Sequence, residues 1–295
     1  MNYFDFLVKN QKAIESTRLH PCKPLEVDGL NQRLKYRGFV NCVAADNENS
    51  FIMFNNADDV VAAHYMYAGP SSFETETLRI WIHLAKKSKW IYDIGAFTGV
   101  FSLAAVAANP YCYVMAFEPS FVTYSRLLVN IHSNEFDARI SPVRFGVGAE
   151  VGELELRHPS GVYVMASDES FLDTRISDPW YTEKVQIVSL DHFLANQDMY
   201  RKEIIVAADF SRVDLLKIDV EGFETEVLKG MKEIIENNRP TAIVEILNRD
   251  NIGEILSLFG DGYTAHHAGD LLDTPEGANV LFIHEDNIGM LSDYS

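Results

Sequence analysis

Short apolar runs alternate with helical patterns from Trp90 onwards, and this alternation constrains the fold more than any other feature. Runs rich in β-branched and aromatic residues are typical of buried strands, and the segments between them carry helical periodicity with Gly or Pro stops. We expect strands at 90–94, 111–117, 140–145, 215–218, 241–247, 263–267 and 280–284. We expect helices at 71–89, 100–108, 122–133, 225–237 and 252–259. The pattern predicts an α/β fold: a Rossmann-like, mostly parallel seven-stranded sheet with helices on both faces.

The first part of the chain follows a different pattern, with two strand-like runs between two helical ones. The expected elements are helices at 4–16 and 58–67 and strands at 39–45 and 50–54. We therefore predict an N-terminal α+β extension or cap over residues 1–72 and a main domain over residues 73–295.

A long insertion interrupts the main domain over residues 146–211. A segment of this length at the end of a sheet strand is typical of a lid or a binding loop. The aromatic residues Phe171, Trp180 and Tyr181 lie in it, and they are predicted either to cover a binding site or to form a small local core.

The charge of the chain limits its partners. The formal net charge is -18, which argues against nucleic acid as the main partner and against a polybasic membrane surface. Three widely spaced cysteines without a CxxC pair support neither a zinc site nor a disulfide framework. The N-terminus does not resemble a signal peptide, and no run approaches the length of a membrane span. We expect a cytoplasmic protein without membrane insertion, and homo-oligomer formation stays open.

A glycine-containing turn follows the strand at 90–94, in the stretch Asp93-Ile-Gly95-Ala-Phe-Thr-Gly99. Gly95 and Gly99 are predicted to let the backbone approach a ligand closely. The amides at the start of the next helix are natural donors to an anionic group. The spacing is not GxGxxG, so the dinucleotide fingerprint fails in detail, and a plain tight turn is the structural alternative.

Acidic residues end two of the expected strands. Glu118, in Phe117-Glu118-Pro119, is predicted to accept the hydroxyls of a ribose, as acids at this position do in nucleotide-binding α/β folds. Asp219 and Glu221 follow the strand at 215–218, at the sheet edge where parallel sheets bind ligands. The alternative for this pair is capping of the next helix.

Five stretches occur in the order IYDIGAFTGVFSLAA, VMAFEPS, VSLDHFL, LLKIDVEGFETEVLKG and RPTAIVEI. This set resembles the FkbM family of class I S-adenosylmethionine-dependent methyltransferases. The resemblance implies an O-methyltransferase that uses S-adenosylmethionine and acts on a hydroxyl of a sugar, glycan, lipid or natural product. The cofactor contacts that it implies are Glu74, Asp93, Gly95, Ala96, Phe97, Gly99, Glu118, Pro119, Ser120 and Asp219. Phe97 departs from the family, in which many members carry a polar residue at this position.

Methyl transfer to a hydroxyl requires alignment of the acceptor and removal of its proton. Asp219 is the first candidate for the proton acceptor, and burial would have to raise its pKa for it to act as a strong base. Glu221 and His192 are further catalytic candidates, although His192 also fits an ordinary surface residue after Asp191, which is expected to cap its own helix.

Three alternatives remain open. An all-oxygen set of Asp219, Glu245 and Asn248 could hold Mg²⁺, although a metal-free reaction is preferred. The chain could also be a nicotinamide-dependent oxidoreductase on a similar fold, or a non-catalytic module that binds the cofactor.

Overall fold

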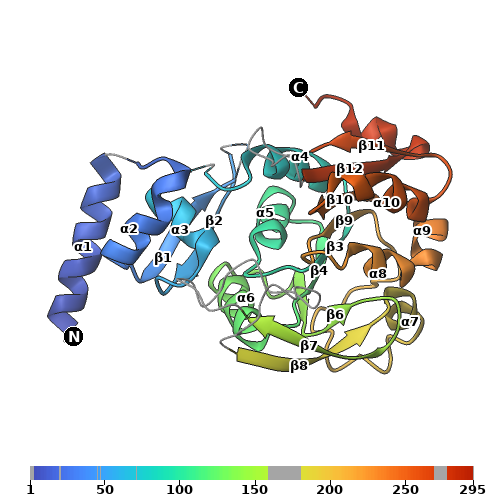
Figure 1. Ribbon diagram of the computed structural model, residues 1–295, viewed down its shortest axis with the longest axis horizontal. Helices are drawn as coiled ribbons and strands as arrows, with labels where there is room; N and C mark the ends of the chain where they lie inside the picture. Colours follow the sequence, from blue (N-terminus) through green and yellow to red (C-terminus); the bar gives the residue numbers. More distant parts are fainter. Residues whose placement is uncertain are drawn as a thin grey trace.

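A seven-stranded sheet forms the centre of the structure, a computed structural model that describes residues 3–19, 21–44, 46, 48–70, 72–158, 181–268 and 278–294 (Figure 1). Its strands are β3 (Trp90–Ile94), β4 (Tyr113–Phe117), β5 (Ile140–Val143), β9 (Leu215–Ile218), β10 (Thr241–Ile246), β11 (Tyr263–His267) and β12 (Ala278–His284). Their order is β11-β12-β10-β9-β3-β4-β5. Within this sheet β12 runs antiparallel to the other six strands, which are parallel to one another. The predicted α/β fold with a mostly parallel seven-stranded sheet is confirmed.

Helices cover both faces of this sheet because successive strand residues point to opposite sides. Ile91 packs in the cluster that contains residues of α4, α5 and α6, and Tyr92 packs in the cluster that contains residues of α7 to α10. The helices are α4 (Thr75–Ala85), α5 (Val100–Ala108), α6 (Phe121–Ser133), α7 (Leu190–Ala195), α8 (Glu224–Lys229), α9 (Lys232–Asn238) and α10 (Ile252–Phe259). Short 3-10 helices are η2 (Arg249–Asn251) and η3 (Glu285–Leu291).

The single helix predicted over 225–237 is wrong, because the chain breaks into α8 and α9 around Gly230. A Cβ at Gly230 would lie 2.0 Å from the carbonyl oxygen of Gly148, so the backbone of the insertion passes directly against this glycine. Close packing between two backbones therefore interrupts a pattern that is helical on both sides.

The insertion builds a second, smaller sheet in the order β6-β8-β7. Its strands are β6 (Gly146–Val147), β7 (Gly152–His158) and β8 (Tyr181–Val188), and β7 pairs antiparallel with β8. Tyr181 begins β8, and its ring lies 5.0 Å from the ring of His158. Phe171 and Trp180, the other two predicted lid aromatics, lie outside the described residues.

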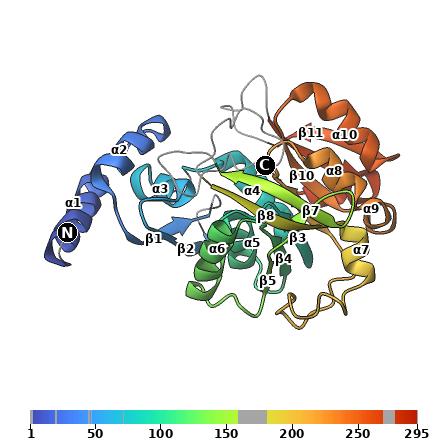
Figure 2. The same ribbon diagram turned by 60° about the horizontal axis from the view of Figure 1, so that its bottom comes forward.

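The N-terminal part forms the predicted α+β unit at one end of the molecule, with α9 and α10 at the opposite end (Figures 1 and 2). Its elements are α1 (Tyr3–Leu19), η1 (Pro24–Glu26), α2 (Val27–Leu34), β1 (Gly38–Val43), β2 (Ser50–Asn55) and α3 (Val60–Tyr67). The sequence did not predict α2, whose eight residues include Gly29. Phe51 and Met53 of β2 join the same buried cluster as Leu78 and Leu127, so this unit shares its core with the main sheet.

None of the helices in the described part of the chain combines the length and the apolar character that a membrane span requires.

Candidate functional site

A cavity of about 220 Å³ opens at the carboxyl ends of β3, β4, β9 and β10. The chain proceeds from β3 to β4 and β5 on one side and returns to β9 and β10 on the other, so the strand order reverses between β3 and β9. Open α/β sheets bind ligands at such a switch point. The cavity is lined by Val61, Phe73, Glu74, Ile94, Gly95, Ala96, Phe97, Val100, Phe101, Phe117, Glu118, Pro119, Phe145, Gly146, Val147, Leu156, Asp219, Val220, Glu221 and Glu245.

Gly95 begins the turn after β3 with φ +80°, and a Cβ there would lie 1.8 Å from the carbonyl oxygen of Asp219. Gly99 has φ +102°, and its Cβ would lie 2.6 Å from Leu127 Cδ1 of α6. Both glycines therefore leave room for neighbouring parts of the protein. Gly95 also lines the cavity, whereas Gly99 does not, so the predicted role of Gly99 in ligand approach is not supported by its place.

The amides of this turn bond mainly within the protein. Gly95 and Ala96 both donate to the carbonyl oxygen of Phe117, and Phe97 donates to Glu118 Oε2 at 3.0 Å. Phe97 lines the cavity with φ +51°, a strained conformation for a residue with a large side chain. Phe97 therefore contributes its ring to the cavity wall and its amide to Glu118.

Glu118 lies at the end of β4 and is held by two backbone amides. Its Oε2 accepts from Phe97 and its Oε1 accepts from Ser120 at 2.8 Å. These two amides fix the orientation of the carboxylate, which lines the cavity. Pro119 lines the cavity beside Glu118, whereas Ser120 is buried and caps α6 through Thr123 N. The predicted pair Glu118 and Pro119 thus reaches the cavity, and Ser120 supports it from behind.

Asp93 lies behind the cavity wall and does not line it. Its side chain is 1% exposed, and Ser102 donates a hydrogen bond of 2.6 Å to its Oδ2. Burial raises the pKa of Asp93 to about 6, against the opposing effects of Ser102 and the nearby ammonium of Lys217. Asp93 therefore positions the start of α5 through Ser102.

Lys217 is fully buried beside Asp219 and does not line the cavity. Its Nζ lies 2.8 Å from Asp219 Oδ2 and 4.7 Å from the ring centre of Phe101. Lys217 was not among the predicted site residues, although a lysine within the apolar run LLKI was a visible signal. A buried lysine needs a partner, and here the carboxylates of Asp219, Glu74 and Glu245 keep its pKa raised despite burial.

Asp219 and Glu245 form a coupled pair across the ends of β9 and β10. Burial opposes ionisation of Asp219, but the charge of Lys217 and a hydrogen bond with Glu245 outweigh it and lower the pKa of Asp219. The negative charge of Asp219, together with burial, raises the pKa of Glu245 far above its ordinary range. Asp219 is therefore ionised and Glu245 protonated near neutral pH, and the raised pKa that Asp219 would need to act as a strong base is not what its surroundings produce.

Glu221 and Glu74 complete the acidic end of the cavity. Both have a left-handed backbone, with φ 53° and 37°. Asn279 of β12, opposite Glu245 in the sheet, donates to Glu74 Oε2 at 3.2 Å. Asn279 was also missed, because it belongs to a strand with no site-forming motif.

The predicted metal set is only partly assembled. Oxygen atoms of Asp219, Glu221 and Glu245 lie within 4.8 Å of one another. Asn248 instead caps η2 by accepting from Asp250 N at 3.0 Å. The ammonium of Lys217 already supplies positive charge at 2.8 Å from Asp219, and it would repel a divalent cation placed there.

His192 is not brought to the cavity. It lies in α7, where its ring packs against Tyr200 and its Nδ1 lies 3.4 Å from Asn196 Nδ2. Ser189 caps α7 by accepting from His192 N, and Asp191 instead accepts from two amides at the start of α9. The prediction that Asp191 caps its own helix is therefore wrong.

Comparisons with known proteins identify the family of the chain. The model of the Methyltransferase FkbM domain family matches residues 93–270, more than half of the chain. Methyltransferase sdnD of Sordaria araneosa is 29% identical over 49% of this chain and 61% of its own length. Hexuronic acid methyltransferase AglP of Haloferax volcanii is 24% identical over 56% of this chain and 59% of its own length.

A third relative covers a larger share of its own sequence. The 31-O-demethyl-FK506 methyltransferase FkbM of Streptomyces tacrolimicus is 25% identical over 59% of this chain and 72% of its own length. The chain spans less than two thirds of the length of the first two relatives. The match to the family extends from Asp93 of the glycine turn through Asp219 and Glu245, and the chain therefore belongs to the FkbM methyltransferase domain family.

Proposed function

We propose that the chain binds S-adenosylmethionine in this cavity and transfers its methyl group to a hydroxyl of a sugar or a hydroxylated natural product. The observation that carries the proposal is that one cavity has carboxylates at both of its ends and apolar side chains between them. The carboxylate of Glu118, oriented by two backbone amides, lines one end, and Asp219 lies among further carboxylates at the other.

The residues present fit the chemical parts of this cofactor. A ribose presents two adjacent hydroxyls, which can donate hydrogen bonds to a carboxylate such as that of Glu118. Beside Glu118, Phe97, Pro119 and Phe145 provide apolar surface for a flat aromatic base. S-adenosylmethionine carries a sulfonium and an ammonium, and the excess of carboxylates at the Asp219 end suits these positive charges.

Bound S-adenosylmethionine supplies a methyl group on sulfur, which is already a good leaving group. The task of the protein is then to align the acceptor and to receive its proton. Asp219, ionised and fixed by Lys217, accepts a hydrogen bond from the acceptor hydroxyl. Its lowered pKa suffices for proton transfer, because the acceptor oxygen becomes strongly acidic as it gains the methyl group and then gives its proton to Asp219. Glu245, which holds a proton, donates a hydrogen bond to Asp219 and keeps it oriented.

Names of two relatives suggest the substrate class. The name of one relative gives a hexuronic acid as its substrate, and the name of another gives 31-O-demethyl-FK506. We therefore propose a sugar acid, glycan or polyhydroxylated natural product as the acceptor.

Calorimetry with S-adenosylhomocysteine tests the cofactor, and release of S-adenosylhomocysteine with a panel of hexuronic acids, neutral sugars and macrolides tests the acceptor. Absence of cofactor binding would overturn the proposal. Binding without turnover of any acceptor would favour a non-catalytic module. With an active acceptor, Asp219→Asn is expected to lower kcat by about 10²- to 10⁴-fold, the usual contribution of a positioned proton acceptor.

We propose that the reaction does not require a metal. Removal of divalent cations with EDTA is expected to change the rate by less than about twofold. A loss of activity that Mg²⁺ restores would instead assign Asp219, Glu221 and Glu245 as metal ligands, with the acceptor pKa lowered by the ion.

A further inference from the structure

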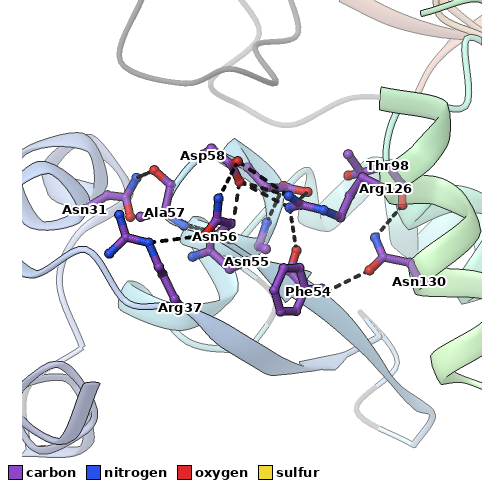
Figure 3. Close-up of polar contacts among 12 residues, drawn as sticks. Asn31, Arg37, Phe54, Asn55, Asn56, Ala57, Asp58, Thr98, Arg126 and Asn130 are labelled. Carbon is purple, nitrogen blue, oxygen red and sulfur yellow. Dashed lines mark hydrogen bonds and ion pairs between the residues drawn. The ribbon is translucent and has the colours of Figure 1, made fainter. Parts of the chain in front are cut away.

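Two side chains of α6, Arg126 and Asn130, and its C-cap residue Asn134 hold the open edge of β2. Figure 3 shows Arg126 and Asn130 beside Phe54 of β2. Asn134 accepts from Ile52 N at 2.8 Å and donates to Ile52 O at 2.7 Å. One turn earlier, Asn130 accepts from Phe54 N at 2.8 Å. The edge strand of the N-terminal hairpin thus pairs with side chains of the main domain in place of another strand.

Arg126 completes this face of α6. It donates to Phe54 O at 2.8 Å and pairs with Asp58 at 3.2 Å, and its guanidinium lies 5.0 Å from the ring centre of Phe54. Asp59 follows Asp58 and caps α3 by accepting from Ala62 N at 2.9 Å. The same contacts therefore fix both β2 and the start of α3.

Asn130 differs from Asn134 because it also reaches the cavity wall. Its Nδ2 donates to Thr98 O at 2.8 Å, inside the turn that contains Phe97 (Figure 3). The side chain is fully buried, so this bond is shielded from water. One amide group therefore joins the backbone of β2 to the backbone of the turn.

The turn needs such support because its backbone is strained. Phe97 and Gly99 both have positive φ, and a non-glycine residue persists there only when its surroundings fix it. Glu118 holds the turn from one side through Phe97 N, and Asn130 holds it from the other through Thr98 O. The N-terminal unit also touches the cavity directly, because Val61 of α3 lines it.

We propose that Asn130 is a positioning residue for the cofactor: it ties the turn at 96–99 to the N-terminal hairpin, so that the unit formed by residues 38–67 is part of the cofactor site. Cofactor binding and docking of this unit then stabilise each other, as reciprocity between coupled sites requires. The inference rests on the proposed use of S-adenosylmethionine and goes beyond it.

The test compares Asn130→Ala with Asn134→Ala. Each variant removes one asparagine that holds β2, but only the first removes the bond to the turn. Asn130→Ala is expected to weaken S-adenosylhomocysteine binding about tenfold, the loss of one buried hydrogen bond, with Asn134→Ala changing it less than about threefold. With an active acceptor, Asn130→Ala raises the KM for S-adenosylmethionine and leaves kcat at saturation unchanged.

Amide hydrogen exchange supplies a second readout on the folded protein. In the wild type, S-adenosylhomocysteine is expected to slow exchange of the amides of Ile52 and Phe54 in β2, and this effect is lost in Asn130→Ala. Equal loss of affinity in both variants, or unchanged affinity in Asn130→Ala, would overturn the inference while the cofactor assignment stands. Failure of the wild type to bind S-adenosylhomocysteine would overturn both.

Discussion

The two ends of the cavity hold their carboxylates by different means. Glu118 is held by the backbone amides of Phe97 and Ser120, which lie close to it along the chain or in the adjoining turn. Asp219 is held by the buried ammonium of Lys217 and by the proton of Glu245, from two neighbouring strands. A carboxylate held by backbone amides can be positioned by a short local motif. A carboxylate held by buried charged side chains is stable only when each of those side chains is present.

Removal of Lys217 is expected to have the largest effect. Lys217→Met leaves the carboxylate of Asp219, whose side chain is only 22% exposed, without its ammonium partner, so the free energy of unfolding should fall by about 3 kcal/mol. Urea denaturation measures this loss. Lys86→Met breaks the exposed pair with Asp46 and should cost less than about 1 kcal/mol. Similar losses in the two variants would show that the charged end is no more dependent on its partners than a surface pair.

The buried carboxyl of Asp93 gives the acidic end a pH dependence. Its pKa is about 6 in the folded chain, against an ordinary value of 3.8, so the folded chain binds more protons between these values and loses stability as pH rises. Asp93→Asn does not titrate. Its free energy of unfolding relative to the wild type should therefore rise by up to about 3 kcal/mol between pH 4 and pH 7.

Urea denaturation of both proteins at several pH values measures this difference in the free energy of unfolding. The contributions of the other carboxylates are the same in both proteins and cancel in the difference. A difference that does not change with pH would contradict the assigned burial effect on Asp93.

Glu118→Gln tests the end built from backbone groups and should have the smallest effect. The amide keeps the shape of the side chain but replaces one acceptor oxygen with a donor, so bonds from an amide or a ribose hydroxyl are lost. Calorimetry should show about 10- to 100-fold weaker binding of S-adenosylhomocysteine. Glu155→Gln, on the exposed side of β7, should change it less than about twofold. Equal affinities in the two variants would remove Glu118 from the cofactor site.

Much of this arrangement could be predicted because it follows from local pattern. The strands of the sheet, the turn at Gly95 and the acids Glu118 and Asp219 all appear in short stretches with a clear period or turn signal. The division at residue 72 stays a prediction, since β2 and α3 share a buried cluster with the main sheet.

The remaining features depend on contacts between distant parts of the chain. Gly99 makes room for Leu127, and Gly230 makes room for Gly148, which no local pattern reveals. In the sequence Asn130 is one polar residue of a helix, and its bond with Phe54 of β2 joins residues that are far apart along the chain. His192 was an expected catalytic candidate by residue type, but its helix turns it towards Tyr200.

The absence of a Cβ at Gly95 also allows the close approach of β9 to the end of β3. Asp219 donates its amide to Ile94 O at 2.9 Å, and its own carbonyl fills the space beside Gly95. Side chains alternate along a strand, so a slip of β9 by one residue would carry Lys217 to the other face of the sheet, among apolar residues. The contact at Gly95 therefore helps to fix the register of β9 against β3, and with it the pairing of Lys217 with Asp219.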